Sequence, residues 1–181
     1  MRRYTHRMTA PDHHPLSLAS SAIHALAGLL DERRPASVLV LSLNPLPAVA
    51  QWCAAHGASL TSLATLDPGT ALTGLGRFDL VVVADQLEYM SAAQGTILLG
   101  TLRNLHSSSL AVLYQPALAP EALRWPPNAF LALGLHRAAE FQQAERHMTL
   151  YRYELDSYNF HRTWNTPEHW ANPQYWGRYW W

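Results

Sequence analysis

Continuous apolar runs, separated by segments of helical pattern, constrain the fold of this chain more than any other feature. Three such runs are SVLVLSL (37–43), FDLVVVAD (78–85) and SLAVLYQP (109–116). A run of Val and Leu without polar alternation is typical of a strand covered on both faces, as in a parallel sheet. Helical spacing of apolar residues occurs at 16–34, 45–56 and 92–105. The alternation predicts an α/β fold with a Rossmann-like, doubly wound and mostly parallel sheet.

Shorter patterns complete the predicted sheet and divide the chain. SLTSLATL (59–66) alternates and predicts a second strand. LHRAAEFQQ and RHMTLYRYEL predict a C-terminal antiparallel strand pair at one edge of the sheet. In the helix predicted at 92–105, we expect one apolar side to be formed by Ile97, Leu98, Thr101, Leu102 and Leu105. We expect a flexible N-terminal tail (1–14), an α/β domain (15–157) and an aromatic-rich C-terminal extension (158–181).

Composition excludes several kinds of chemistry. The chain of 181 residues has 13 basic and 13 acidic side chains, and every basic one is Arg. Without Lys there is no phosphate-loop, kinase-type or Schiff-base lysine. The balanced charge argues against a nucleic-acid partner. One cysteine, Cys53, excludes a disulfide framework and is expected in the core. No apolar run is long enough for a membrane span, and we expect a cytoplasmic protein.

The turn after the first predicted strand carries two prolines where many nucleotide-binding proteins have glycines. Asn44 is expected to cap the following helix, with Pro45 at its first position and Pro47 at its third. Each proline lacks an N–H that a ligand could have used, and Leu46 adds bulk. The turn therefore favours starting a helix over holding a cofactor.

Three polar residues follow the buried strand 78–85, at the sheet edge where open α/β folds bind ligands. They are Asp85, Glu88 and Tyr89. The two carboxylates are candidates for acid and base catalysis in a shared helical turn. The alternative is that they cap a helix and contribute surface charge.

The C-terminal extension is unusually aromatic. Its candidate interaction residues are Trp164, Trp170, Tyr175, Trp176, Tyr179 and Trp180. NTPEHW and ANPQYW predict short helical turns that begin at Pro167 and Pro173. The aromatic residues have three possible receptors: the chain's own sheet, a protein partner or second copy, and single-stranded nucleic acid. The last would use Arg152, Arg162 and Arg178, and neutral charge makes it the weakest.

Metal binding is not expected in this extension. The candidate ligands are His161, Glu168 and His169, and their spacing matches no compact metal motif.

The segment FDLVVVADQLEYM, followed by a helix and LRNLHSSSLAVLYQP, resembles the second half of class I S-adenosylmethionine (SAM)-dependent methyltransferases. The matching positions are Phe78, Asp79, Asp85, Leu87 and Glu88. The resemblance covers about residues 16–155 and includes the late antiparallel pair. The chain is also similar to small uncharacterised bacterial proteins with the same degraded pattern and an aromatic C-terminus.

Departures from this family pattern fall at the cofactor loop. Val40 stands where the family has an acidic residue in its first strand. Ser42, Asn44 and Leu46 stand at the positions of its three loop glycines, and Ser107–Ser109 at its Pro-Gly-Gly turn. The resemblance implies that a cofactor, if one binds, is SAM, held near Ser42, Asn44, Asp67 and Asp85. Asp67 is the nearest counterpart of the acid that holds the ribose.

Three functional hypotheses follow. The first is a non-catalytic methyltransferase-like domain without a cofactor, which acts through a protein partner or a homodimer formed by the aromatic C-terminus. The second is an active SAM-dependent methyltransferase with an atypical loop. The third is a module that binds single-stranded RNA through the aromatic tail.

Overall fold

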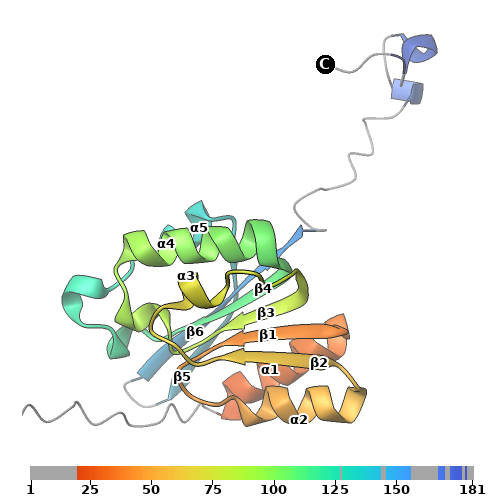
Figure 1. Cartoon of the computed structure of the whole chain (residues 1–181). Coiled ribbons are helices and arrows are strands. Elements are labelled where there is room, and N and C mark those ends of the chain that lie inside the picture. Colours follow the sequence, from red (N-terminus) through yellow and green to blue (C-terminus); the bar gives the residue numbers. More distant parts are fainter. Residues whose placement is uncertain are drawn as a thin grey trace, which may run out of the picture.

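A mixed six-stranded sheet organises the described part of the chain (Figure 1). The computed structural model describes residues 20–126, 128–143, 146–155, 167–169, 172–176 and 178. The strand order is β2-β1-β3-β4-β6-β5. The strands are β1 (Ser37–Leu41), β2 (Ser59–Leu63), β3 (Phe78–Val83), β4 (Ser107–Tyr114), β5 (His136–Gln143) and β6 (Arg146–Glu154). The first four are parallel, and β6 pairs antiparallel with both β4 and β5. The predicted sheet and its antiparallel edge pair are therefore confirmed.

Helices cover both faces of this sheet (Figure 1). One face carries α1 (Ser20–Arg33) and α2 (Pro47–His56), and the other carries α3 (Pro68–Ala71), α4 (Ala92–Thr101) and α5 (Ala129–Ala132). Alternate residues of a strand enter the two cores: Val38 and Val40 pack towards α1 and α2, whereas Leu39 and Leu41 pack on the opposite side. Both faces of the central strands are buried, which explains why their sequences are continuously apolar.

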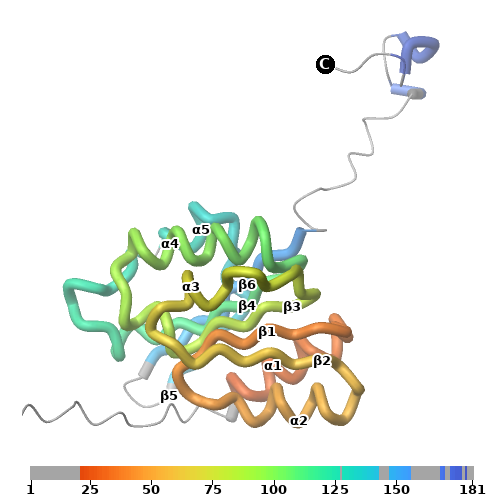
Figure 2. Tube along the Cα trace, in the orientation of Figure 1, coloured from red at the N-terminus to blue at the C-terminus, as the bar shows by residue number. Residues whose placement is uncertain are grey.

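The chain changes faces of the sheet after β2, as Figure 2 shows along the trace. The connection from β1 to β2 runs through α2 on one face, and the connection from β2 to β3 runs through α3 on the other. Since β1 lies between β2 and β3, the carboxyl ends of β1 and β3 flank a topological switch point. In open α/β sheets this is the place where a crevice forms, and it locates the candidate site.

Helix α4 begins as a capping box and ends earlier than its pattern predicts. The Ser91 hydroxyl accepts a hydrogen bond from the Gln94 backbone, and the Gln94 side chain accepts one from the Ser91 backbone. The α-helix ends at Thr101 and continues as a π-helical turn. Leu98 is buried, but Ile97 is 71% exposed. Leu105 is likewise 64% exposed, so the predicted apolar side is wrong at both of these positions.

Gly95, within α4, lies against the indole ring of Trp125. A Cβ added at Gly95 would lie 2.7 Å from Trp125 Cη2 and closer still to Cζ2. The ring cannot easily withdraw, because Trp125 is buried and stacks on Phe130. Gly100 offers a matched control in the same helix, since a Cβ there meets no atom within 4 Å.

We predict opposite effects for alanine at these two glycines. Gly95→Ala should lower the free energy of unfolding by about 1–3 kcal/mol, because overpacking displaces Trp125. Gly100→Ala should raise it by about 0.5–1 kcal/mol, because alanine is the better helix former. Urea unfolding followed by far-UV circular dichroism measures both. Equal effects of the two substitutions would show that Trp125 does not pack on α4 in this way.

Candidate functional site

The candidate site lies where the loops after β1 and β3 meet. The ladder between these strands continues one step beyond their ends, through a hydrogen bond from Ala84 N to Leu41 O at 3.0 Å. On the other side of β1, Ser42 N donates to Leu63 O at 3.1 Å. These bonds fix the starting points of both loops and direct their next residues into the switch-point crevice.

A side-chain hydrogen bond spans this crevice. Asn44 Nδ2, in the loop after β1, donates to Asp85 Oδ2, in the loop after β3. Asp85 is 2% exposed and has a positive φ of 49°, a conformation that Asp and Asn tolerate better than most residues. Sequence reasoning placed both residues at this edge, and the structure shows that they contact each other.

The prediction that Asn44 caps α2 is wrong. The helix begins at Pro47, its N-cap residue is Leu46, and no side chain caps it. Because Asn44 lies outside the helix, its amide is directed to Asp85 instead of to the first turn. Pro47 therefore occupies the first helical position and not the third.

This bend offers a ligand few backbone donors. Pro45 and Pro47 have no N–H, and the N–H groups of Val49 and Ala50 donate to Leu46 O at 3.1 and 3.2 Å. Leu46 is 8% exposed and packs in the core below α2. A helix N-terminus usually presents several unpaired amides to an anion, and here most of them are absent or occupied.

Glu88 is a buried carboxylate, so its interpretation as surface charge is wrong. It is 1% exposed, and Ser91 caps the following helix. Its Oε1 accepts from Gln115 N at 2.8 Å and its Oε2 accepts from Gln86 N at 3.1 Å. Both oxygens therefore tie the loop after β3 to the end of β4. Burial raises the pKa of Glu88 to about 7, Asp85 contributes in the same direction, and the backbone N–H groups oppose the rise.

Tyr89 completes the polar network around Asp85. Burial first, then the charge of Asp85 and the hydrogen bond to it, raise the pKa of Tyr89 to about 12. The phenol therefore stays protonated at neutral pH. Asn44 and Tyr89 thus approach one carboxylate from opposite loops; we call these three residues the Asp85 network.

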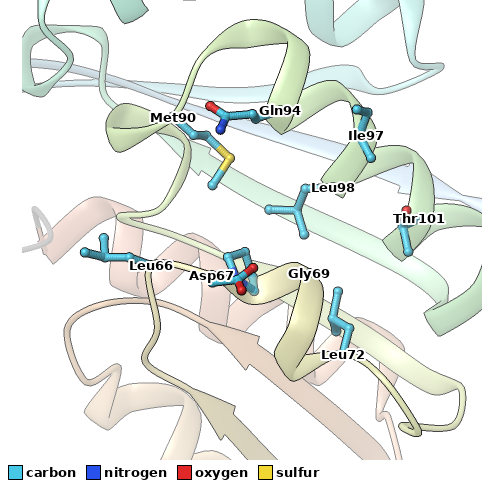
Figure 3. A pocket seen from close by; sticks show the side chains of 10 residues that line it. Leu66, Asp67, Gly69, Leu72, Met90, Gln94, Ile97, Leu98 and Thr101 are labelled. Atoms are coloured by element: carbon cyan, nitrogen blue, oxygen red, sulfur yellow. The ribbon is translucent and has the colours of Figure 1, made fainter.

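An apolar pocket of about 240 Å³ opens beside this network, between α3 and α4 (Figure 3). Met90 and Leu98 project into it from one side, and the Asp67 loop faces them. Its remaining lining residues are Leu66, Pro68, Gly69, Leu72, Gln94, Ile97 and Thr101. The pocket is mainly hydrophobic, with the Asp67 carboxylate and the Gln94 amide as its strongest polar groups.

Asp67, the candidate ribose-binding acid, caps a helix in this structure. Its Oδ1 accepts from Thr70 N at 3.4 Å, and its Oδ2 accepts from Thr70 Oγ1 at 2.7 Å. These hydrogen bonds lower the pKa of Asp67, the side-chain bond contributing most. The carboxylate lines the pocket but is separate from the Asp85 network.

Two buried side-chain oxygens belong to residues of which the sequence indicated only one as a candidate site residue. Ser42 Oγ and Gln86 Oε1 are buried and have no hydrogen-bond partner among the described residues. The Gln86 amide nitrogen donates to Thr65 O at 3.0 Å, which joins the loop after β3 to the loop after β2. Ser42 was a candidate, whereas Gln86 carried no signal because its burial depends on tertiary packing. Unpaired buried oxygens are where a bound water or ligand would be stabilised.

The candidate interaction residues of the C-terminal extension are described only in part. Trp164, Trp170, Tyr179 and Trp180 lie outside the described residues. The predicted turns are present as 3₁₀ helices, Pro167–His169 and Pro173–Tyr175. Tyr175 is 44% and Trp176 37% exposed.

Arg152 belongs to the sheet and not to a nucleic-acid surface of the extension. Arg152 lies in β6 and forms ion pairs with Glu32 at 3.3 Å and with Glu154 at 2.5 Å. Arg162 lies outside the described residues, and Arg178 is exposed.

Neither a metal cluster nor a membrane-spanning helix is found in the described ranges. No three His, Cys, Asp or Glu side chains there converge as metal ligands. No helix among these residues has the length and hydrophobicity needed to cross a membrane. Of the metal candidates, His161 lies outside the described residues.

Comparisons with known proteins identify a sequence family and a fold. The sequence model of a family of unknown function (DUF6231) matches residues 20–181. A search of curated proteins gives no match.

Solved structures similar to the chain include several methyltransferases. Magnesium protoporphyrin IX methyltransferase (ChlM) from Synechocystis PCC 6803, with bound SAM, is 13% identical, with a TM-score of 0.50 over 73% of this chain and 77% of that one. PigF, solved with SAH, gives the same identity and TM-score over 73% of this chain and 54% of that one. An O-methyltransferase family protein from Burkholderia thailandensis is 16% identical (TM-score 0.48, 76% of this chain and 56% of that one). The chain thus spans little more than half of the last two proteins. The likeness to ChlM and PigF shows a Rossmann-like methyltransferase fold.

The burial of Glu88 predicts a specific pH dependence of stability. Its pKa is about 7 in the folded chain and 4.5 in the unfolded chain, so only the folded state keeps the proton between these values. The contribution to stability is complete below pH 4.5 and is lost as the pH rises through 7. Relative to Glu88→Gln, which does not titrate, the wild type should lose about 2–3 kcal/mol of unfolding free energy between pH 5 and pH 8. Chemical denaturation at both pH values measures this difference, and parallel profiles would contradict it.

Proposed function

We propose that this chain, which belongs to the family of unknown function DUF6231, is a non-catalytic methyltransferase-like domain that acts through protein interaction. The observation that carries the proposal is the hydrogen bond between Asn44 and Asp85. It occupies the switch point at which folds of this class bind ligands. An adenosyl ligand seated there would have to break it and leave the buried Asp85 carboxylate with fewer partners.

Backbone chemistry at the same bend supports the proposal. Two prolines remove donors, and Leu46 is held in the core, so it cannot turn aside to make room. A glycine turn would leave both donors and space. The bend therefore stabilises α2 and closes the crevice with the same residues.

The candidate catalytic groups are also engaged in structural contacts. Both Glu88 oxygens accept backbone hydrogen bonds, and Tyr89 keeps its proton at neutral pH. A general base needs an oxygen or nitrogen directed at the substrate. Glu88 instead holds two loops together, which accounts for its position without a reaction.

Exposed apolar residues around the neighbouring pocket support a binding role. Leu66 and Ile97 line this pocket and are 72% and 71% exposed. The pocket, at about 240 Å³, is smaller than the roughly 300–1,000 Å³ typical of small-molecule sites. Apolar side chains at its rim, together with Tyr175 and Trp176, are of the kind that anchors protein interfaces.

The direct test of a closed crevice is titration of the full chain with SAM. We expect no saturable heat in calorimetry and no rise in melting temperature at 1 mM SAM. A ligand present at a hundred times its Kd would stabilise the fold by about 2.7 kcal/mol, which is readily detected. Saturable binding in the micromolar range would overturn the proposal.

A second candidate function is SAM-dependent methyl transfer with an atypical cofactor loop. It is favoured by the buried unpaired oxygens of Ser42 and Gln86 and by the Asp67 carboxylate in the apolar pocket. Methyl transfer needs chiefly the placement of donor and acceptor, so it does not require a dedicated base.

Asp67→Asn separates this candidate from the first. Asparagine remains a good N-cap, so the stability of the domain should change by less than about 0.5 kcal/mol. If SAM is held by the Asp67 carboxylate, its affinity should fall roughly tenfold, the loss expected for a charged hydrogen bond. Calorimetry on both forms measures this, and SAM affinity that is equal in the two would exclude the role of Asp67.

A further inference from the structure

A second pocket, of about 450 Å³, lies beside the β5–β6 hairpin at the carboxyl end of β4. It shares no lining residue with the pocket between α3 and α4. Its volume falls within the range of small-molecule sites. We describe it by two parts: an aromatic floor of Tyr114, Trp125, Phe130 and Tyr151, and a polar rim of Arg124, Arg137, Glu140 and His147.

The aromatic floor is rigid before any ligand binds. Phe130 stacks on Tyr151, with ring centroids 4.1 Å apart and planes inclined by 15°. Trp125 stacks on the same Phe130 at 4.9 Å. Tyr114 Oη accepts a hydrogen bond from Trp125 N at 2.9 Å, and all four residues are at least 94% buried. Because Tyr151 and Trp125 already cover Phe130, the floor is preformed, and a ligand that contacts it costs little side-chain entropy.

The polar rim carries one unbalanced positive charge. Arg137 donates to Glu140, so these two charges neutralise each other. His147 Nε2 lies 3.8 Å from the same carboxylate. The Arg124 guanidinium forms no hydrogen bond or ion pair with any described residue, although its backbone is fixed by a bond from Arg124 N to Glu121 O. An unpaired guanidinium beside an aromatic floor attracts an anion and can bind its oxygens in a bidentate manner.

We propose that this pocket binds a small planar aromatic anion, with its ring against the aromatic floor and its carboxylate or phosphate group on Arg124. The ring gains apolar burial against the floor, and the anionic group replaces solvent at the guanidinium. Glu140 does not repel this ligand, because Arg137 neutralises it. The proposal concerns residues outside the Asp85 network and is independent of SAM binding.

Two probes that differ only in charge test the proposal on the full chain. These are 2-naphthoate and its uncharged isostere 2-naphthamide, followed by ligand-observed NMR and calorimetry. We expect 2-naphthoate to bind at least tenfold more tightly than the amide. A third probe, 2-naphthyl phosphate, shows which anionic group the pocket prefers: tighter binding of the phosphate or of the carboxylate each supports the site and assigns its ligand class.

Two variants locate the binding to this pocket. Arg124→Gln removes an exposed guanidinium, and 2-naphthoate affinity should fall about tenfold, as expected for loss of one charged contact. Arg34→Gln removes the same charge near the opposite edge of the sheet, where α1 ends before β1, and should leave the affinity unchanged. Far-UV circular dichroism confirms that both variants fold.

Three results would overturn the proposal. They are equal affinity for the naphthoate and the naphthamide, equal affinity in Arg124→Gln and wild type, or no binding of 2-naphthoate up to its solubility limit. None of these outcomes depends on whether the chain binds SAM. This proposal and the proposed function can therefore fail separately.

Discussion

The buried carboxylate of Asp85 is the constraint on which the site depends. A carboxylate that is 2% exposed is costly unless hydrogen-bond donors surround it. Asn44 provides a donor from the loop after β1 and Tyr89 contributes from the turn after β3, so one charged group holds these two loops together. The hydrogen bond between Asn44 and Asp85 therefore spans the switch point that a parallel sheet creates.

Glu88 extends the same principle to the next strand. Its two oxygens join the backbone of Gln86 to that of Gln115, so the ends of β3 and β4 are fixed relative to each other. Burial raises the pKa of Glu88, and the nearby charge of Asp85 adds a smaller contribution in the same direction. Perturbed carboxylates often mark active sites, but structural networks perturb them as well. Here the hydrogen-bond partners are backbone amides, which favours the structural explanation.

The sequence predicted the features that depend on local pattern. Continuous Val and Leu runs identified the strands buried on both faces. The helical pattern at 45–56 agrees with α2, which Gly57 ends in the left-handed conformation. It did not predict contacts set by residues far along the chain. Asn44 has the local chemistry of an N-cap, but Asp85, 41 positions away, accepts its amide hydrogen instead. Ile97 fits a helical apolar stripe but lies beyond the edge of the core. The pocket beside the β5–β6 hairpin is likewise lined by segments that are far apart in the sequence and meet only in the folded chain.

The chain has a methyltransferase-like sheet, and our proposal is that its usual ligand position is occupied internally by the Asn44–Asp85 contact. A crystal structure of the full chain grown with millimolar SAM tests this most directly. We expect continuous density for the Asn44 and Asp85 side chains in contact, with no nucleoside density at the ends of β1 and β3. Adenosyl density at that position, with Asn44 turned away from Asp85, would contradict it.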